Sequence, residues 1–172
     1  WDHPQFPNIP WSSTDWFINN NSMTKELSSS TIPHLFAGVK VKGKPYTVSE
    51  YNHPFPNRYQ AEAPLFFGAY SSFHDIDGIM YFEYNSSYEY TLDKINGYFS
   101  IHNNPIFMAL NPSIAYMFRN NLISSGLETY NISLSKSDIL KIPAIDDGNW
   151  SGHKFFDKNI AFAHKSQIVD FN

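Results

Sequence analysis

Three side chains that can take part in chemistry lie within four residues of one another: Glu50, Asn52 and His53. They follow a short run of strand-forming residues, 45–48, and two prolines interrupt the chain directly after them. A carboxylate can act as a nucleophile, and a neighbouring amide and imidazole can hold it, or a ligand, by hydrogen bonds. Glu50 also has a simpler interpretation, as a capping or ion-paired carboxylate.

The elements that must position these residues alternate between helix and strand, after a loop over residues 1–24. Apolar spacing and strand-like runs mark five segments: helices over 30–41, 58–75 and 105–121, and strands over 45–50 and 78–84. This alternation is typical of β/α units around a parallel sheet. Ligands of such sheets bind at the carboxyl ends of the strands, so we expect Glu50 to lie in a site.

The pattern changes after residue 127. The segments LETYNISL, DKNIAFAH and SQIVDF are rich in strand formers, and the turn-like DDGNWSG separates the first from the other two. No helical period connects them. We therefore predict that residues 123–172 begin a separate β-rich, all-β domain.

The composition excludes several classes of protein. The 172 residues contain no cysteine, which rules out disulfides, thiolate metal sites and a cysteine nucleophile. The 12 lysines and arginines are scattered and the net charge is -4, so we expect no nucleic-acid partner. No apolar run approaches the roughly 18 residues of a membrane span. Aromatic residues make up 17% of the chain, which suits stacking against the C–H faces of a sugar.

The order of strand, Glu50, proline-rich loop, helix and Asp-Gly strand resembles the seventh and eighth β/α units of the clan A glycoside hydrolases, the cellulase-like and β-galactosidase-like barrels. The resemblance covers residues 1–122. It implies an α/β fold, the C-terminal portion of a (β/α)8 TIM barrel with about its last two β/α units, followed by the start of the all-β domain. It also implies a retaining glycoside hydrolase, acting on O-glycosidic bonds in oligo- or polysaccharides without a metal or cofactor, in which Glu50 after Ser49 is the nucleophile.

The resemblance further implies six substrate-binding residues: Asp2, His3, Asn52, His53, Glu83 and Tyr84. His3 and His53 fit equally well as loop residues that hold Glu50 by hydrogen bonds. A whole barrel needs about 250 residues, and the chain has no Asn-Glu pair for the general acid, which we expect upstream of residue 1. We therefore expect the missing N-terminal part of the same barrel, or self-association, to complete the fold. We expect the 172 residues alone to hydrolyse no glycoside, because they supply one of the two catalytic carboxyl groups. We also expect a secreted or periplasmic protein, although the sequence shows no signal peptide.

Two other classes of function are compatible with some of these residues. In a noncatalytic carbohydrate-binding module, aromatic rings would stack on sugar and Glu50 would only bind hydroxyl groups. A metal-dependent hydrolase is disfavoured because the seven histidines show no HxH or HExxH spacing. A serine nucleophile is disfavoured because no GxSxG is present.

Overall fold

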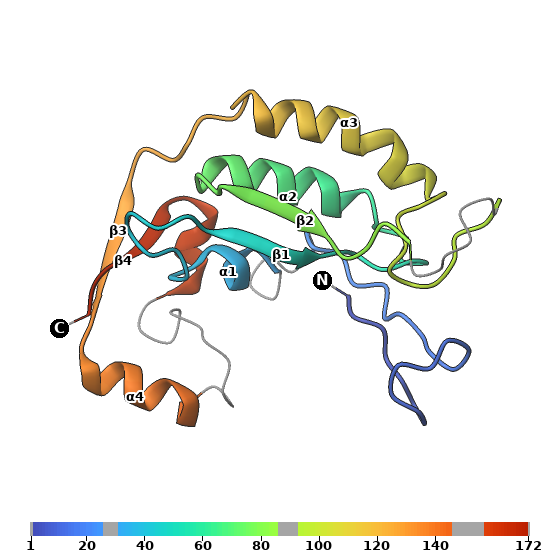
Figure 1. The fold of residues 1–172 in the computed structure, drawn as a ribbon, viewed down its shortest axis with the longest axis horizontal. Helices are drawn as coiled ribbons and strands as arrows, with labels where there is room; N and C mark the ends of the chain where they lie inside the picture. The colour runs from blue at the N-terminus through green and yellow to red at the C-terminus, as the bar shows by residue number, and fades with distance from the viewer. Residues whose placement is uncertain (1, 26–30, 86–92, 146–156, 172) are drawn as a thin grey trace.

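The computed structural model describes residues 2–25, 31–85, 93–145 and 157–171 (Figure 1). The turn-like segment DDGNWSG lies outside the described residues. In chain order the elements are α1 (Thr31–Phe36), β1 (Thr47–Tyr51), α2 (Glu62–Phe73), β2 (Gly78–Tyr81), α3 (Pro105–Arg119), β3 (Thr129–Leu134), α4 (Lys136–Ile145), the 3-10 helix η3 (Lys158–Phe162) and β4 (Lys165–Phe171).

The first pair of strands, β1 and β2, is parallel, as predicted for the segments 45–50 and 78–84. Val48 of β1 lies opposite Ile79 of β2, and Tyr51 lies opposite Tyr81, with an irregular register between these two pairings. The crossover between the strands is α2, because parallel neighbours need a long connection. The carboxyl ends of β1 and β2 therefore lie at the same edge of the sheet (Figure 1).

Helix α2 packs on β1 and β2, and α3 packs on α2 (Figure 1). The Tyr51 and Phe67 rings have centroids 3.8 Å apart, which places the end of β1 against the middle of α2. Gly68 lets the two helices approach closely, since a Cβ atom there would lie 2.3 Å from Ile114 Cγ2. The buried cluster continues through α1, with Ile32 fully buried.

The second pair, β3 and β4, is also parallel, and its first pairing is Thr129 with Lys165. β4 also forms a bridge between Ile168 and Val41, which connects this pair to the chain segment that follows α1. Within the described residues, no helix combines the length and apolar character needed to cross a bilayer.

The predicted fold class is wrong. Within the described residues, the four strands form two separate two-stranded sheets and no barrel, so the chain is not the C-terminal portion of a (β/α)8 barrel. The alternating pattern of helix and strand correctly predicted one parallel pair. It could not show whether further strands join that pair, because this depends on contacts far apart in the sequence.

The predicted all-β character of the last third is also wrong. Helix α4 and η3 lie between β3 and β4, and the pairing is parallel. Ser135 and Asp138 bond to each other's backbone N–H groups, with distances of 3.1 and 3.0 Å, and this reciprocal cap explains why a helix begins directly after β3. Asp157 caps η3 by accepting from Asn159 N, so DKNIAFAH forms a helical turn instead of a strand. The domain boundary between residues 122 and 123 stays a prediction.

Candidate functional site

Glu50 lies at the carboxyl end of β1 with its side chain exposed. Val48 and Tyr51 are buried, and the two residues between them, Ser49 and Glu50, are both exposed. The irregular register against β2 falls at the same place, so the strand presents two successive side chains to solvent. Within the described residues, the Glu50 carboxylate has no hydrogen bond and no ion pair. In the described part of the chain, no contact therefore supports the interpretation of Glu50 as a capping or ion-paired carboxylate.

Asn52 fixes the chain directly after Glu50. Its side chain is 1% exposed, and its Nδ2 group donates to the backbone oxygens of Phe82, at 2.7 Å, and Phe99. Its Oδ1 atom accepts from the backbone N–H of His53 at 2.7 Å. Asn52 thus joins the end of β1 to the chain just after β2 and to a third segment at Phe99, whose carbonyl oxygen also accepts from the Glu83 N–H group at 3.2 Å.

His53 is fully buried beneath the same loop. Its Nε2 atom lies 3.1 Å from the carbonyl oxygen of Asn21, which can only accept, so Nε2 carries the proton. The Nδ1 atom is buried without a hydrogen-bond partner among the described residues. Burial lowers the pKa of His53 to about 4, so the ring is neutral near pH 7. The ring supports the loop through its bond to Asn21, and its contact with a substrate stays a prediction.

Asp2 anchors the N-terminal loop to the loop that follows β1. Its carboxylate is 1% exposed and accepts from the backbone N–H groups of Asn19 (3.3 Å) and Asn21 (3.0 Å). It also accepts from the Asn57 side chain at 2.7 Å. These three bonds satisfy a buried charge, so the structure gives Asp2 a supporting position. Its contact with a substrate stays a prediction.

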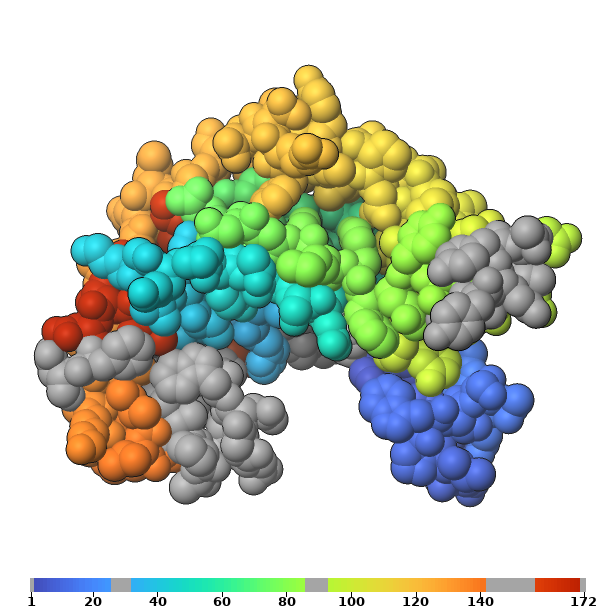
Figure 2. Space-filling model, in the orientation of Figure 1, coloured from blue at the N-terminus to red at the C-terminus, as the bar shows by residue number. Residues whose placement is uncertain are grey.

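His3 belongs to a group of rings that we call the aromatic cluster: His3, Phe6, Trp11, Trp16, Tyr98 and Phe99. The His3 ring lies 5.4 Å from Trp11 and 5.8 Å from Phe99, measured between centroids. Trp11 is 63% exposed. The cluster joins the N-terminal loop to residues 98–99, and the blue N-terminal loop projects from the molecule beside that part of the chain (Figure 2).

Glu83 and Tyr84 continue the chain beyond β2. Three backbone hydrogen bonds join this segment to residues 99–102. The Tyr84 side chain is 54% exposed, and its ring packs 5.3 Å from His102. Glu83 lies near the aromatic cluster, because its N–H group donates to the Phe99 carbonyl oxygen at 3.2 Å. Burial, and the negative charge of Glu83, raise the pKa of Tyr98.

The side chains that support the site were missed in the sequence: Asn21, Asn57, Gln60, Glu62 and Asn104. Gln60 donates to the carbonyl oxygen of His53 at 3.0 Å, and Asn104 donates to Gln60 at 3.2 Å while its own Oδ1 caps α3. The carboxylate of Glu62, at the start of α2, accepts hydrogen bonds from residues 22–24. Asn104 before Pro105 is a helix-start signal visible in the sequence, but its bond to Gln60 is not.

The structure therefore brings Asp2, Asn52 and His53 into one buried network, and places His3 and Glu83 at the aromatic cluster. Glu50 stands at the surface of this arrangement and bonds to none of them. Among the described residues, no three His, Asp or Glu side chains gather as metal ligands. A comparison with protein-family models, with curated proteins and with solved structures finds no match to this chain.

Proposed function

We propose that this chain acts on carbohydrate, with Glu50 as the nucleophile of a retaining glycoside hydrolase. The observation that carries this proposal is the contrast at the end of β1. The Glu50 carboxylate is exposed and uncommitted within the described residues, while the residues after it are buried and fixed by hydrogen bonds. A nucleophile needs free oxygens on a rigid backbone, because reaction requires a defined approach to the attacked atom.

The chemistry assigned to Glu50 is a double displacement. One carboxylate oxygen attacks the anomeric carbon, a new C–O ester bond forms, and the bond from that carbon to the leaving oxygen breaks with its electron pair. Water then attacks the same carbon, the bond to the Glu50 oxygen breaks, and the sugar and the free carboxylate are released as the water gives up one proton to solvent. The departing oxygen of an ordinary glycoside needs a proton from a second carboxyl group about 5 to 5.5 Å away. Our proposal assigns the nucleophile alone.

The aromatic cluster supports a sugar as the ligand. Asn52, two residues after Glu50, bonds to the Phe99 carbonyl oxygen, and the Phe99 ring packs on His3 and Tyr98. The cluster thus lies at the same end of β1 as Glu50. The exposed indole ring of Trp11 can stack on the C–H face of a pyranose ring, and the nearby Glu83 carboxylate can accept bonds from hydroxyl groups.

A 2,4-dinitrophenyl glycoside tests this proposal directly, because its leaving group departs without a proton and so needs no general acid. We expect a rapid burst of dinitrophenolate of about one equivalent per chain, followed by a slow phase limited by hydrolysis of the ester. The substrates are a panel of dinitrophenyl glycosides, and the measurement is absorbance in stopped flow.

The variant is Glu50→Gln, which keeps shape and hydrogen bonding and removes the nucleophile; we expect it to lose the burst. The control is Glu128→Gln, the same change at an exposed carboxylate that faces His164 across 3.2 Å, and we expect it to keep the burst. An unchanged burst in Glu50→Gln would remove Glu50 from the chemistry.

The second candidate function is a carbohydrate-binding module, and the 63% exposure of Trp11 beside other rings favours it. In that case no dinitrophenolate is released by any variant, while Trp11→Ala weakens sugar binding about tenfold or more and Glu50→Gln leaves it nearly unchanged. Titration with the sugars of the same panel separates the two candidates.

A further inference from the structure

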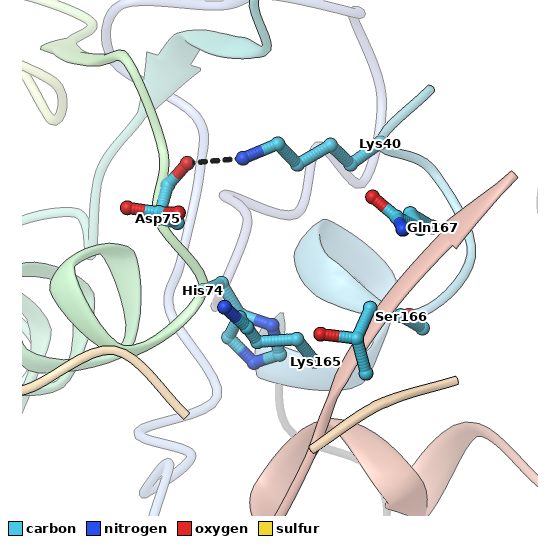
Figure 3. A pocket seen from close by; sticks show the side chains of 7 residues that line it. Lys40, His74, Asp75, Lys165, Ser166 and Gln167 are labelled. Carbon is cyan, nitrogen blue, oxygen red and sulfur yellow. Dashed lines mark hydrogen bonds between the residues drawn. The ribbon is translucent and has the colours of Figure 1, made fainter. Parts of the chain in front are cut away.

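A small polar cavity lies where the end of α2, the segment after α1 and the β3/β4 sheet meet (Figure 3). Its volume is about 50 Å³, which is room for a few water molecules or one small ion. Seven residues line it: Lys40, His74, Asp75, Thr129, Lys165, Ser166 and Gln167.

Two of these residues, Lys40 and Lys165, bring positive charge, and neither forms an ion pair within the described residues. Lys40 Nζ donates to the backbone oxygen of Asp75 (Figure 3), and Lys165 Nζ donates to the Ser125 hydroxyl at 2.7 Å. Each ammonium group has three donors, so each keeps donors for a further partner. Two like charges at one cavity repel each other, and an anion between them removes that repulsion.

The backbones that carry the two lysines are held in place. Ile168 N donates to the Lys40 carbonyl oxygen at 2.8 Å, which ties the segment after α1 to β4. Lys165 begins β4, and its N–H group donates to the carbonyl oxygen of Glu128 at 3.1 Å. The distance between the Cα atoms of Lys40 and Lys165 is therefore fixed by backbone hydrogen bonds to the sheet.

Three further lining residues differ in whether they can donate to a ligand: Ser166, His74 and Thr129. Ser166 Oγ accepts from Gly38 N at 2.8 Å and donates to the Phe36 carbonyl oxygen at 3.1 Å, so its only proton is already used. His74 Nε2 donates to Ala161 O at 2.8 Å, and burial lowers the pKa of His74 to about 4, so this ring adds no charge near pH 7. The Thr129 hydroxyl has no partner among the described residues and can donate to a ligand.

We infer that this cavity binds a small tetrahedral oxyanion, a phosphate or sulfate group, between the ammonium groups of Lys40 and Lys165 and the hydroxyl of Thr129. The volume of about 50 Å³ has room for one such group. The exposed carboxylate of Asp75 also lines the cavity and repels an anion there, so removing its charge should strengthen anion binding.

The test is isothermal titration calorimetry of the 172-residue chain with inorganic phosphate, sulfate and phenyl phosphate, each at constant ionic strength set with sodium chloride. We expect saturable binding of phosphate and sulfate. Equal binding of phenyl phosphate assigns the site to a monoester as well as to the free ion, and its failure to bind assigns the site to the free ion. An absence of saturable heat for all three anions overturns the inference without any variant.

Variants locate the site and are checked for folding by circular dichroism. Lys40→Met and Lys165→Met should each weaken phosphate binding about tenfold or more, and Asp75→Asn should tighten it several-fold. Lys42→Met, the same change at an exposed lysine outside the cavity, is the matched control and should leave affinity unchanged.

Three further variants keep the test decisive if a methionine disturbs the fold. Lys40→Arg and Lys165→Arg retain the positive charge and should retain anion binding. Ser125→Ala removes only the hydroxyl to which Lys165 donates, and should also retain anion binding. Equal weakening by Lys42→Met, or unchanged binding after loss of both cavity lysines, would show that the anion binds elsewhere.

Discussion

Both pairs of strands are parallel and have a helix between their two strands, but different interactions hold them in the molecule. In the first pair, β1 buries Val48 and Tyr51 against the helices, and the Tyr51 ring packs on Phe67. In the second, β3 buries only Leu134 of its six residues. β4 is joined to the rest of the molecule by the Ser166 hydroxyl and by a backbone bridge at Ile168.

This difference separates two kinds of site. Side-chain burial beneath β1 makes a rigid platform from which one carboxylate, Glu50, stands free. The polar attachment of β4 leaves a small cavity with two lysines and no carboxylate bonded to them within the described residues. The first suits covalent chemistry that needs a fixed nucleophile, and the second suits the reversible binding of an ion.

The largest expected effect compares one tyrosine from each pair. Tyr51 is fully buried, so Tyr51→Ala removes an entire core ring and should lower the free energy of unfolding by about 3–5 kcal/mol. Tyr130 of β3 is 45% exposed, and Tyr130→Ala should cost less than about 1 kcal/mol. Urea unfolding followed by circular dichroism measures both. Similar losses for the two variants would contradict the different burial of the two pairs.

The second expected effect is a loss of stability in mild acid, with one histidine from each region. Burial lowers the pKa of both His53 and His74 to about 4, whereas an unfolded histidine titrates near 6.5. The unfolded chain therefore binds more protons between these values, so the stability is complete above 6.5 and is lost as the pH falls towards 4. Each ring should account for about 2 kcal/mol between pH 7 and pH 5.

The matched variants are His53→Gln and His74→Gln, and the quantity compared is the change in unfolding free energy with pH, not its value at one pH. Each variant should remove about half of the dependence between pH 7 and pH 5. If His53→Gln keeps the full dependence, the ring is not buried and neutral beneath the loop.

A smaller effect tests the polar attachment of β4. Ser166→Ala leaves the buried N–H group of Gly38 without its acceptor and should cost about 1–3 kcal/mol, with 1 the more usual value for one neutral bond. Ser133→Ala, an exposed serine of β3, should change the unfolding free energy by less than about 0.5 kcal/mol. Thermal unfolding of both variants supplies the comparison, and an equal midpoint for the two would show that the hydroxyl does not hold this strand.

The sequence allowed the first parallel pair to be predicted because its signals are local. Strand formers, turn residues and helical spacing mark β1, α2 and β2 within a few residues of their observed ends. The number of strands in the sheet was predicted wrongly, since it depends on pairings that no local pattern specifies. Helix α4 was missed although Ser135 and Asp138 are a visible helix-start pair, because the strand formers on both sides dominated the interpretation.

The sequence also allowed the position of Glu50 near the end of a strand to be predicted, but not the hydrogen-bond network beneath it. The Asp2 carboxylate bonds to Asn57, 55 residues away, and Asn52 bonds to Phe99, 47 residues away. Asparagine and glutamine in loops have many possible partners, and only the folded backbone selects among them. The roles of these residues as supports therefore emerged from the structure alone.

The most direct test of Glu50 as the nucleophile is the mass of the peptide that carries it after reaction with a 2,4-dinitrophenyl 2-deoxy-2-fluoroglycoside. The fluorine slows hydrolysis of the glycosyl ester, and the leaving group departs without a proton, so the covalent intermediate accumulates. Proteolysis and tandem mass spectrometry then locate the added sugar. Our account predicts one fluorosugar per chain, bonded to Glu50 and absent from Glu50→Gln. A sugar attached to any other carboxylate, such as Glu83, would contradict it.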